Sequence, residues 1–269
     1  MYILLIIISA RVDSVTSGVP IHNANGSPSQ LQIITDICST LQTFANPCAG
    51  FYLESDGSLR GTYDVQQDVA YAEGLTKLDD VLRTKPGTIS QQESYYLSTI
   101  LTVSLLHLRN TPWLSGTWDK TQIAFLRVKG SASSGSVDIK QPFLIRKHQK
   151  TPHINPVGSP QPNDSSTLAA LGVMLLEIYY RLPVESLDGL DISGTPPMQV
   201  DSVHRWVMEK ESKGDLTFAF AKAIRFCLEC FQGPNKLILE PEFSDAVDIN
   251  VLKPLQEELN FIVHGPWGI

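Results

Sequence analysis

The stretch from Ser90 to Leu108 limits the fold of this chain more than any other feature of its sequence. Ser90 is a favourable helix N-cap, and Glu93, three residues later, completes a capping box. The helix that begins there carries apolar side chains on nearly every face: Tyr96, Leu97, Ile100, Leu101, Val103, Leu105 and Leu108. Such a helix has to be covered all round. We therefore predict a central, buried helix that ends before Asn110-Thr111-Pro112.

A second capped helix is predicted from Asp164 or Ser165 to Arg181, and Pro183 ends it. Apolar residues at helical spacing form its buried stripe, which consists of Leu168, Leu171, Leu175 and Ile178. Gly172 lies in the same helix. Because glycine has no side chain, we expect another helix to pack closely at this position.

The other predicted elements divide the chain into a strand-bearing first part and a mainly helical second part. Strands are predicted over 49–53, 123–128 and 142–145, with a hairpin-type turn at 55–57. Helices are predicted over 31–44, 75–82, 200–213, 216–231 and 245–263. The last of these presents Ile249, Leu252, Leu255, Leu259 and Ile262 to the core. This order predicts an α+β fold.

The composition is that of a globular protein. Of the 269 residues, 42% are apolar, which is enough for a sizeable core. Lys plus Arg total 21 and Asp plus Glu total 28, so the formal net charge is −7. A nucleic-acid partner is disfavoured, because binding to phosphates requires a basic face. Four cysteines are too few for a disulfide scaffold of this size.

The first ten residues, Met1–Ala10, form an almost purely apolar run that is too short to span a bilayer. Three interpretations stay open. The run is the apolar region of a signal peptide ending near residue 17, a buried strand, or the remnant of a gene that starts further upstream. The first implies a secreted protein and the others a cytoplasmic one. Residues 1–30 as a whole are expected to be an apolar start followed by a loop.

Few side-chain patterns indicate chemistry. Cys227 and Cys230 form a CxxC pair, but it falls near the end of an apolar helix, so we expect buried structural thiols. His148 and His153 lie in a basic, proline-containing stretch that is interpreted as a solvated loop. No GxSxG, GxGxxG or GxxxxGK[ST] motif occurs in the sequence. The sequence therefore predicts neither a metal site nor a cofactor.

Two tryptophans, Trp113 and Trp118, follow the first buried helix directly. Large aromatic side chains in a turn usually fasten that turn to the core. An exposed binding surface is the alternative interpretation.

The second capped helix resembles one in the carboxy-terminal lobe of protein kinases. There a helix with an LGVxLLEL pattern follows the activation segment, as Leu171–Ile178 does here. The later stretch Ala223–Leu228 fits the same lobe. The resemblance implies a protein-kinase-like fold with a reduced strand-bearing N-terminal part and a mainly helical C-terminal lobe, divided near residues 84–88.

The chain more narrowly resembles a fungal kinase-like family, domain of unknown function 7580, over residues 31–263, leaving 264–269 as a tail. The match begins at Asp36-Ile37-Cys38 and ends in the helix Val251–Leu259. Its most specific part is the turn after the first buried helix. The residues that carry the family resemblance are His107, Thr111, Pro112, Trp113, Leu114, Trp118, Leu171, Gly172, Glu177 and Cys227. The resemblance gives these residues a structural role.

Kinase chemistry requires an Asp that orients the substrate hydroxyl, an Asn and a second Asp for Mg²⁺, and a Lys for the phosphates. At the position of the catalytic loop this chain reads Thr111–Asp119, with no His-Arg-Asp. Val128-Lys129-Gly130 stands where Asp-Phe-Gly is expected. The resemblance therefore implies a non-catalytic, pseudokinase-type domain that binds another protein in a fungal cytoplasm. The alternatives are a weakly active or inactive nucleotide binder and a secreted fungal protein.

Overall fold

The protein is described by a computed structural model that covers residues 3–7, 33, 35, 49–53, 59–64, 71–84, 89–109, 118–129, 136–147, 164–232 and 242–265. The chain divides into two compact units. One comprises Met1–Arg11 and Ala72–Ile269, and the other comprises Val12–Tyr71. The division into lobes near 84–88 stays a prediction.

The smaller unit contains a β-hairpin. Strands β2 (Ala49–Leu53) and β3 (Leu59–Asp64) pair antiparallel, with a register shift between Gly50 and Tyr52. This confirms the strand predicted over 49–53. The predicted helix over 31–44 and the turn at 55–57 lie outside the described residues, apart from Ile33 and Thr35.

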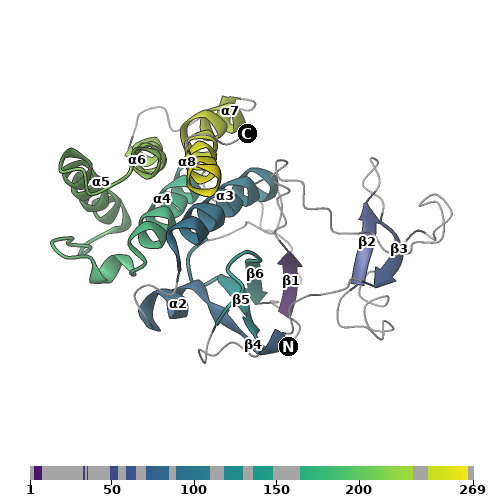
Figure 1. Ribbon diagram of the computed structural model, residues 1–269. Coiled ribbons are helices and arrows are strands. Elements are labelled where there is room, and N and C mark those ends of the chain that lie inside the picture. The colour runs from purple at the N-terminus through teal and green to yellow at the C-terminus, as the bar shows by residue number, and fades with distance from the viewer. Residues whose placement is uncertain are drawn as a thin grey trace, which may run out of the picture. The chain divides into compact units, whose positions relative to one another are not determined.

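The larger unit contains a sheet of four strands in the order β1-β6-β5-β4 (Figure 1). These are β1 (Ile3–Ile7), β4 (Tyr71–Lys77), β5 (Ile123–Val128) and β6 (Phe143–Lys147). β6 pairs antiparallel with both β1 and β5, and Ile123 lies opposite Leu144. The N-terminal apolar run thus contains a strand, as one of its three interpretations predicted. The strands predicted over 123–128 and 142–145 are confirmed, the second with a shift of one to two residues.

The short helix predicted over 75–82 begins three residues later than expected. Residues 75–77 complete β4, and helix α2 runs from Leu78 to Thr84. Pairing within the sheet outweighs the helical spacing of the leucines at this point. Asp79 and Asp80 then fall in the first helical turn, where acidic side chains interact favourably with the helix dipole.

Helix α3 (Gln91–Leu108) confirms the prediction of a central helix. The capping box is present: the Glu93 amide donates to Ser90 Oγ at 3.2 Å, and the Ser90 amide donates to Glu93 Oε2 at 2.8 Å. Leu97, Leu101 and Leu105 are fully buried. Figure 1 shows α3 beside α4 (Asp164–Tyr180), which confirms the second predicted helix.

Three further helical segments surround this pair. Helix α6 (Phe218–Gln232) packs on α4 and on α5 (Pro196–Ser212), and α8 (Lys253–His264) packs on α3 and α6. Between α4 and α5 lies a short 3₁₀ turn, η3 (Val184–Ser186). The described part is therefore α+β, with a small sheet and mainly helical content.

Helix α5 begins at Pro196, four residues before the predicted start at residue 200. Proline is well suited to the first helical turn, because its missing N–H has no partner there in any helix. Val203, Trp206 and Val207 form the buried face of this helix.

The single helix predicted over 245–263 is interrupted. Helix α7 (Glu242–Val247) passes into a π-helical turn, η4 (Asp248–Leu252), before α8 begins. The wider turn shifts the α-helical pattern. The prediction that Ile249 faces the core is therefore wrong: its side chain is 52% exposed, whereas Leu255 is fully buried.

Aromatic side chains connect the helices of the core. The ring of Phe220 on α6 lies 4.7 Å from that of Tyr95 on α3 and 4.9 Å from that of Tyr179 on α4. The Tyr180 ring in turn lies 5.3 Å from that of Trp206 on α5. Four helices thus meet through one chain of ring contacts.

Candidate functional site

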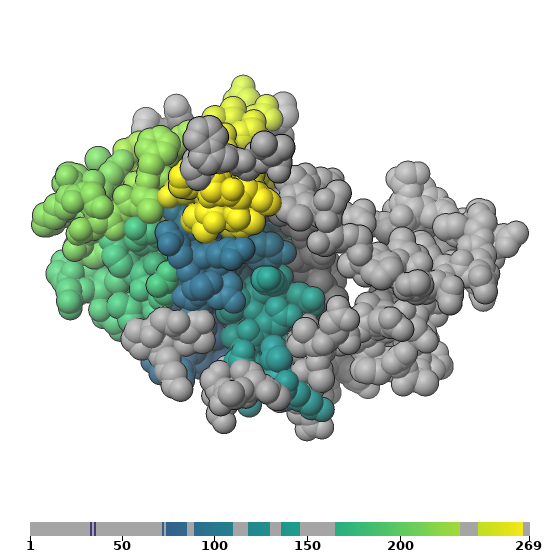
Figure 2. Space-filling model, viewed as in Figure 1, coloured from purple at the N-terminus to yellow at the C-terminus, as the bar shows by residue number. Residues whose placement is uncertain are grey.

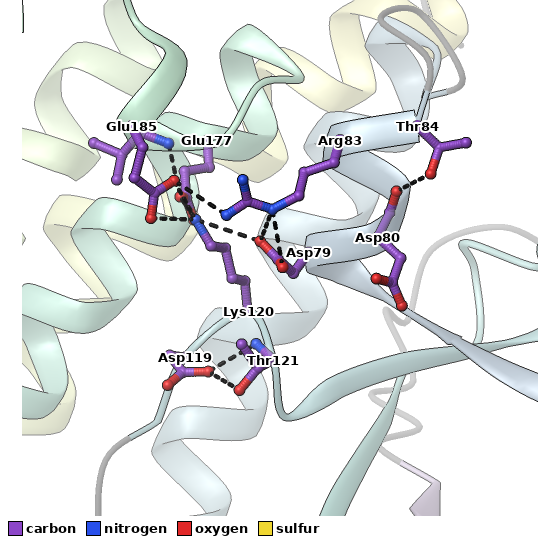
Figure 3. A network of polar contacts seen from close by, with 10 residues as sticks. Asp79, Asp80, Arg83, Thr84, Asp119, Lys120, Thr121, Glu177 and Glu185 are labelled. Atoms are coloured by element: carbon purple, nitrogen blue, oxygen red, sulfur yellow. Dashed lines mark hydrogen bonds and ion pairs between the residues drawn. The ribbon is translucent and has the colours of Figure 1, made fainter.

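The densest group of charged side chains in the described residues surrounds Lys120 (Figure 3). Its members come from four segments of the chain. Asp79 and Arg83 lie on α2, Lys120 precedes β5, Glu177 lies near the end of α4, and Glu185 lies in η3. We call these five residues the Lys120 cluster.

The pair at its centre is buried. The Lys120 side chain is 11% exposed and that of Glu177 is 2% exposed. Lys120 Nζ donates to Glu177 Oε1 at 2.5 Å, and the backbone N–H of Val184 donates to the same oxygen at 2.9 Å. The carboxylate therefore has two donors, and it joins α4 to η3 as well as to the segment before β5.

The outer members of the cluster are more exposed. Lys120 Nζ also donates to Glu185 Oε2 at 2.9 Å and lies 3.6 Å from Asp79 Oδ1. Arg83 Nε donates to Asp79 Oδ1 at 3.0 Å, and its Nη2 lies 3.6 Å from Glu185 Oε2. Glu185 and Arg83 thus close the cluster on its solvent side, where the side chains are 43% and 50% exposed.

Burial and charge act in opposite directions on the pKa values of these groups. Burial raises the pKa of Glu177 above its ordinary value, although Lys120 and the Val184 N–H lower it in part. The carboxylates of Glu177 and Glu185 raise the pKa of Lys120, against the effect of its burial. Partial burial raises the pKa of Glu185, but its hydrogen bond with Lys120 and the charges of Lys120 and Arg83 together lower it below its ordinary value. Lys120 is therefore the cation that compensates a buried acid.

Glu177 is the only family-motif residue of the sequence analysis that the described structure places in the Lys120 cluster. Two others, Gly172 and Cys227, meet at the interface of α4 and α6, and a third, Leu171, lies in the core. Leu171 is fully buried, and Gly172 faces Cys227 so closely that a Cβ atom at position 172 would lie 2.9 Å from Cys227 Cβ. The predicted close approach at this glycine is confirmed. Burial raises the pKa of the Cys227 thiol, in agreement with a structural role.

The remaining predicted residues lie elsewhere. Trp118 is 3% exposed and belongs to the core, as expected of a side chain that fastens a turn. His107 is exposed in the last turn of α3. The turn formed by Thr111, Pro112, Trp113 and Leu114 lies outside the described residues, as do His148 and His153.

Sequence reasoning did not anticipate Lys120, Glu185, Asp79 or Arg83. One signal was available. Glu177 is the only charged residue between Leu168 and Tyr180, and Lys120 lies between a buried tryptophan and a buried strand. Two opposite charges in apolar surroundings predict a pair, because a lone buried charge is costly. Lys120 and Glu177 are 57 positions apart in the sequence, so local patterns do not reveal the pair.

Within the described ranges, no group of three or more His, Cys, Asp or Glu side chains is arranged to hold a metal ion. Among the same residues, no helix has the length and apolar character that crossing a bilayer requires.

The comparison with protein families assigns the chain to a family. Residues 11–262 match the family described as Domain of unknown function (DUF7580), and the chain belongs to that family. The match extends further toward the N-terminus than the resemblance over 31–263 indicated. No curated protein and no solved structure matches the chain.

Proposed function

We propose that this chain is a degenerate, protein-kinase-like domain that binds other proteins and does not transfer phosphate. The proposal includes a fungal origin and a cytoplasmic location, both of which follow from the family resemblance. The order of elements supports the kinase-like fold: a long buried helix, an antiparallel pair of strands, and a central helix with the sequence Leu171–Ile178. Because one fold can host many functions, the site has to carry the rest of the argument.

The observation that carries the proposal is the burial of the Lys120–Glu177 pair, whose side chains are 11% and 2% exposed. In kinases a lysine binds the phosphates and acidic side chains hold Mg²⁺. Here the ammonium group of Lys120 is 2.5 Å from Glu177 and 2.9 Å from Glu185. Glu177 also accepts a hydrogen bond from Val184. These contacts join three segments of the fold, namely α4, η3 and the segment before β5, which supports a structural role for the pair.

A thermal-shift titration with ATP tests this function. We expect the melting midpoint of the full chain to stay unchanged at millimolar ATP, both with and without Mg²⁺, because a ligand stabilises only the state that binds it. Mg²⁺ alone serves as the control for effects of the ion. A rise in midpoint that requires both ATP and Mg²⁺ would contradict the proposal and favour the nucleotide-binding alternative.

A further inference from the structure

An open groove of about 490 Å³ lies between the beginning of α6 and the junction of η4 with α8. Its two walls come from different helical segments. Phe218 and Lys222 line it from α6, and Ile249, Pro254 and Glu257 line it from η4 and α8. The exposed side of α8 is the yellow surface in Figure 2. This groove is separate from the Lys120 cluster, none of whose residues lines it.

Two apolar side chains project from the groove into solvent. Phe218 is 77% exposed and Ile249 is 52% exposed. The residues after Phe218 are buried: Ala219 is 2% exposed and Phe220 is fully covered. An aromatic side chain exposed to this extent beside a partly apolar groove has the character of an interface anchor.

The charges of the two walls are complementary. The α6 wall carries Lys222, whose ammonium donates to the carbonyl oxygen of Ile249 at 3.2 Å and is thereby held at the edge of the groove. The α8 wall carries Glu257 and Glu258, of which Glu258 accepts a hydrogen bond from the backbone N–H of Ala219 at 3.2 Å. Its only cation, Lys253, is already paired with Asp248 at 2.8 Å. One wall is therefore basic with a projecting phenylalanine, and the other is acidic with an apolar floor.

We propose that this groove binds a second copy of the chain in a twofold-symmetric dimer. In such a dimer the same surface of both copies is used, so it has to be complementary to itself. The groove meets this condition. Phe218 of one copy enters the groove of the other beside Ile249, and Lys222 of each copy faces Glu257 of the other. The proposal rests on the interaction role proposed above and names one partner for it.

Sedimentation equilibrium of the full chain tests the dimer. We expect the mass to rise from that of one 29.7 kDa chain toward that of two, with half-association at about 1–100 µM, the range of a modest interface. Phe218→Asp should keep the mass at one chain over this range. Met198→Asp is the matched control, because Met198 is 59% exposed on α5 and does not line the groove. It should associate as the wild type does.

A charge exchange keeps the proposal testable independently of Phe218. Glu257→Lys alone should weaken the association by about tenfold or more, because it places like charges opposite each other. Combining it with Lys222→Glu should restore the association. A wild-type chain that stays monomeric over the whole range would overturn the proposal, as would a dimer that Phe218→Asp leaves intact. Neither result changes the outcome expected of the ATP titration, so the dimer proposal and the proposed function can fail separately.

Discussion

Replacing Lys120 by methionine is expected to destabilise the protein by about 3–5 kcal/mol, the usual effect of removing one partner of a buried ion pair. The substitution leaves the Glu177 carboxylate, 2% exposed, without its cation. For a domain of this size the loss corresponds to a fall in melting midpoint of roughly 6–20 °C. Differential scanning calorimetry of the two proteins measures it.

The loss of stability caused by Lys120→Met should depend on pH. Burial already raises the pKa of Glu177 in the folded protein, and removing Lys120 raises it further. When the pKa of a carboxyl group is higher in the folded state than in the unfolded state, the protein loses stability as the pH rises from the lower value to the higher one. The difference between variant and wild type should therefore be largest at neutral pH and should shrink as the pH falls and Glu177 takes up a proton in the folded variant.

Two further variants distinguish pairing from the loss of a lysine as such. Lys213→Met removes a lysine whose ion pair with Glu209 is more than half exposed, and the melting midpoint should hardly change. Adding Glu177→Gln to Lys120→Met removes the buried charge, while the amide oxygen still accepts from Val184. The double variant should recover most of the loss. A double variant as unstable as Lys120→Met would contradict a charge-pair role.

Replacing Phe220 by alanine is expected to cost about 3–5 kcal/mol, because the ring is fully buried and a cavity remains when it is removed. The ring contacts Tyr95 on α3 and Tyr179 on α4, so its loss loosens three helices at once. Unfolding in urea, followed by circular dichroism, measures the change in the free energy of unfolding.

The control for Phe220 lies two residues away on the same helix. Phe218→Ala makes the same chemical change at a side chain that is 77% exposed. At a protein concentration low enough to prevent self-association, we expect a change within about 0.5 kcal/mol. Equal losses in the two variants would contradict the described orientation of α6.

The best predictions from sequence concern segments in which local signals and burial agree. Ser90 and Glu93 mark the start of α3 by backbone chemistry alone, and Gly172 marks a close contact whatever its partner is. Predictions failed where a non-local effect decided. Sheet pairing extends β4 to Lys77, and the π-helical turn exposes Ile249. Neither effect leaves a signal in local spacing.

The candidate site was harder to predict, because its geometry joins residues that are distant in sequence. Glu177 was identified through a family motif, without its partner. Lys120 is 57 residues away, and Asp79 lies on a helix whose start was misplaced. A buried carboxylate predicts that a cation exists, but its position depends on how α2 and β5 pack beside α4. Only the fold supplies that information.

The central claim is that Lys120 and Glu177 hold the fold together and perform no phosphoryl transfer. The most direct test is phosphate release from ATP with Mg²⁺, measured for the wild type and for Lys120→Met at a temperature at which both are folded. The account predicts that both rates equal the rate in buffer. Mg²⁺-dependent release by the wild type that disappears in the folded variant would contradict it, and would make Lys120 a catalytic residue.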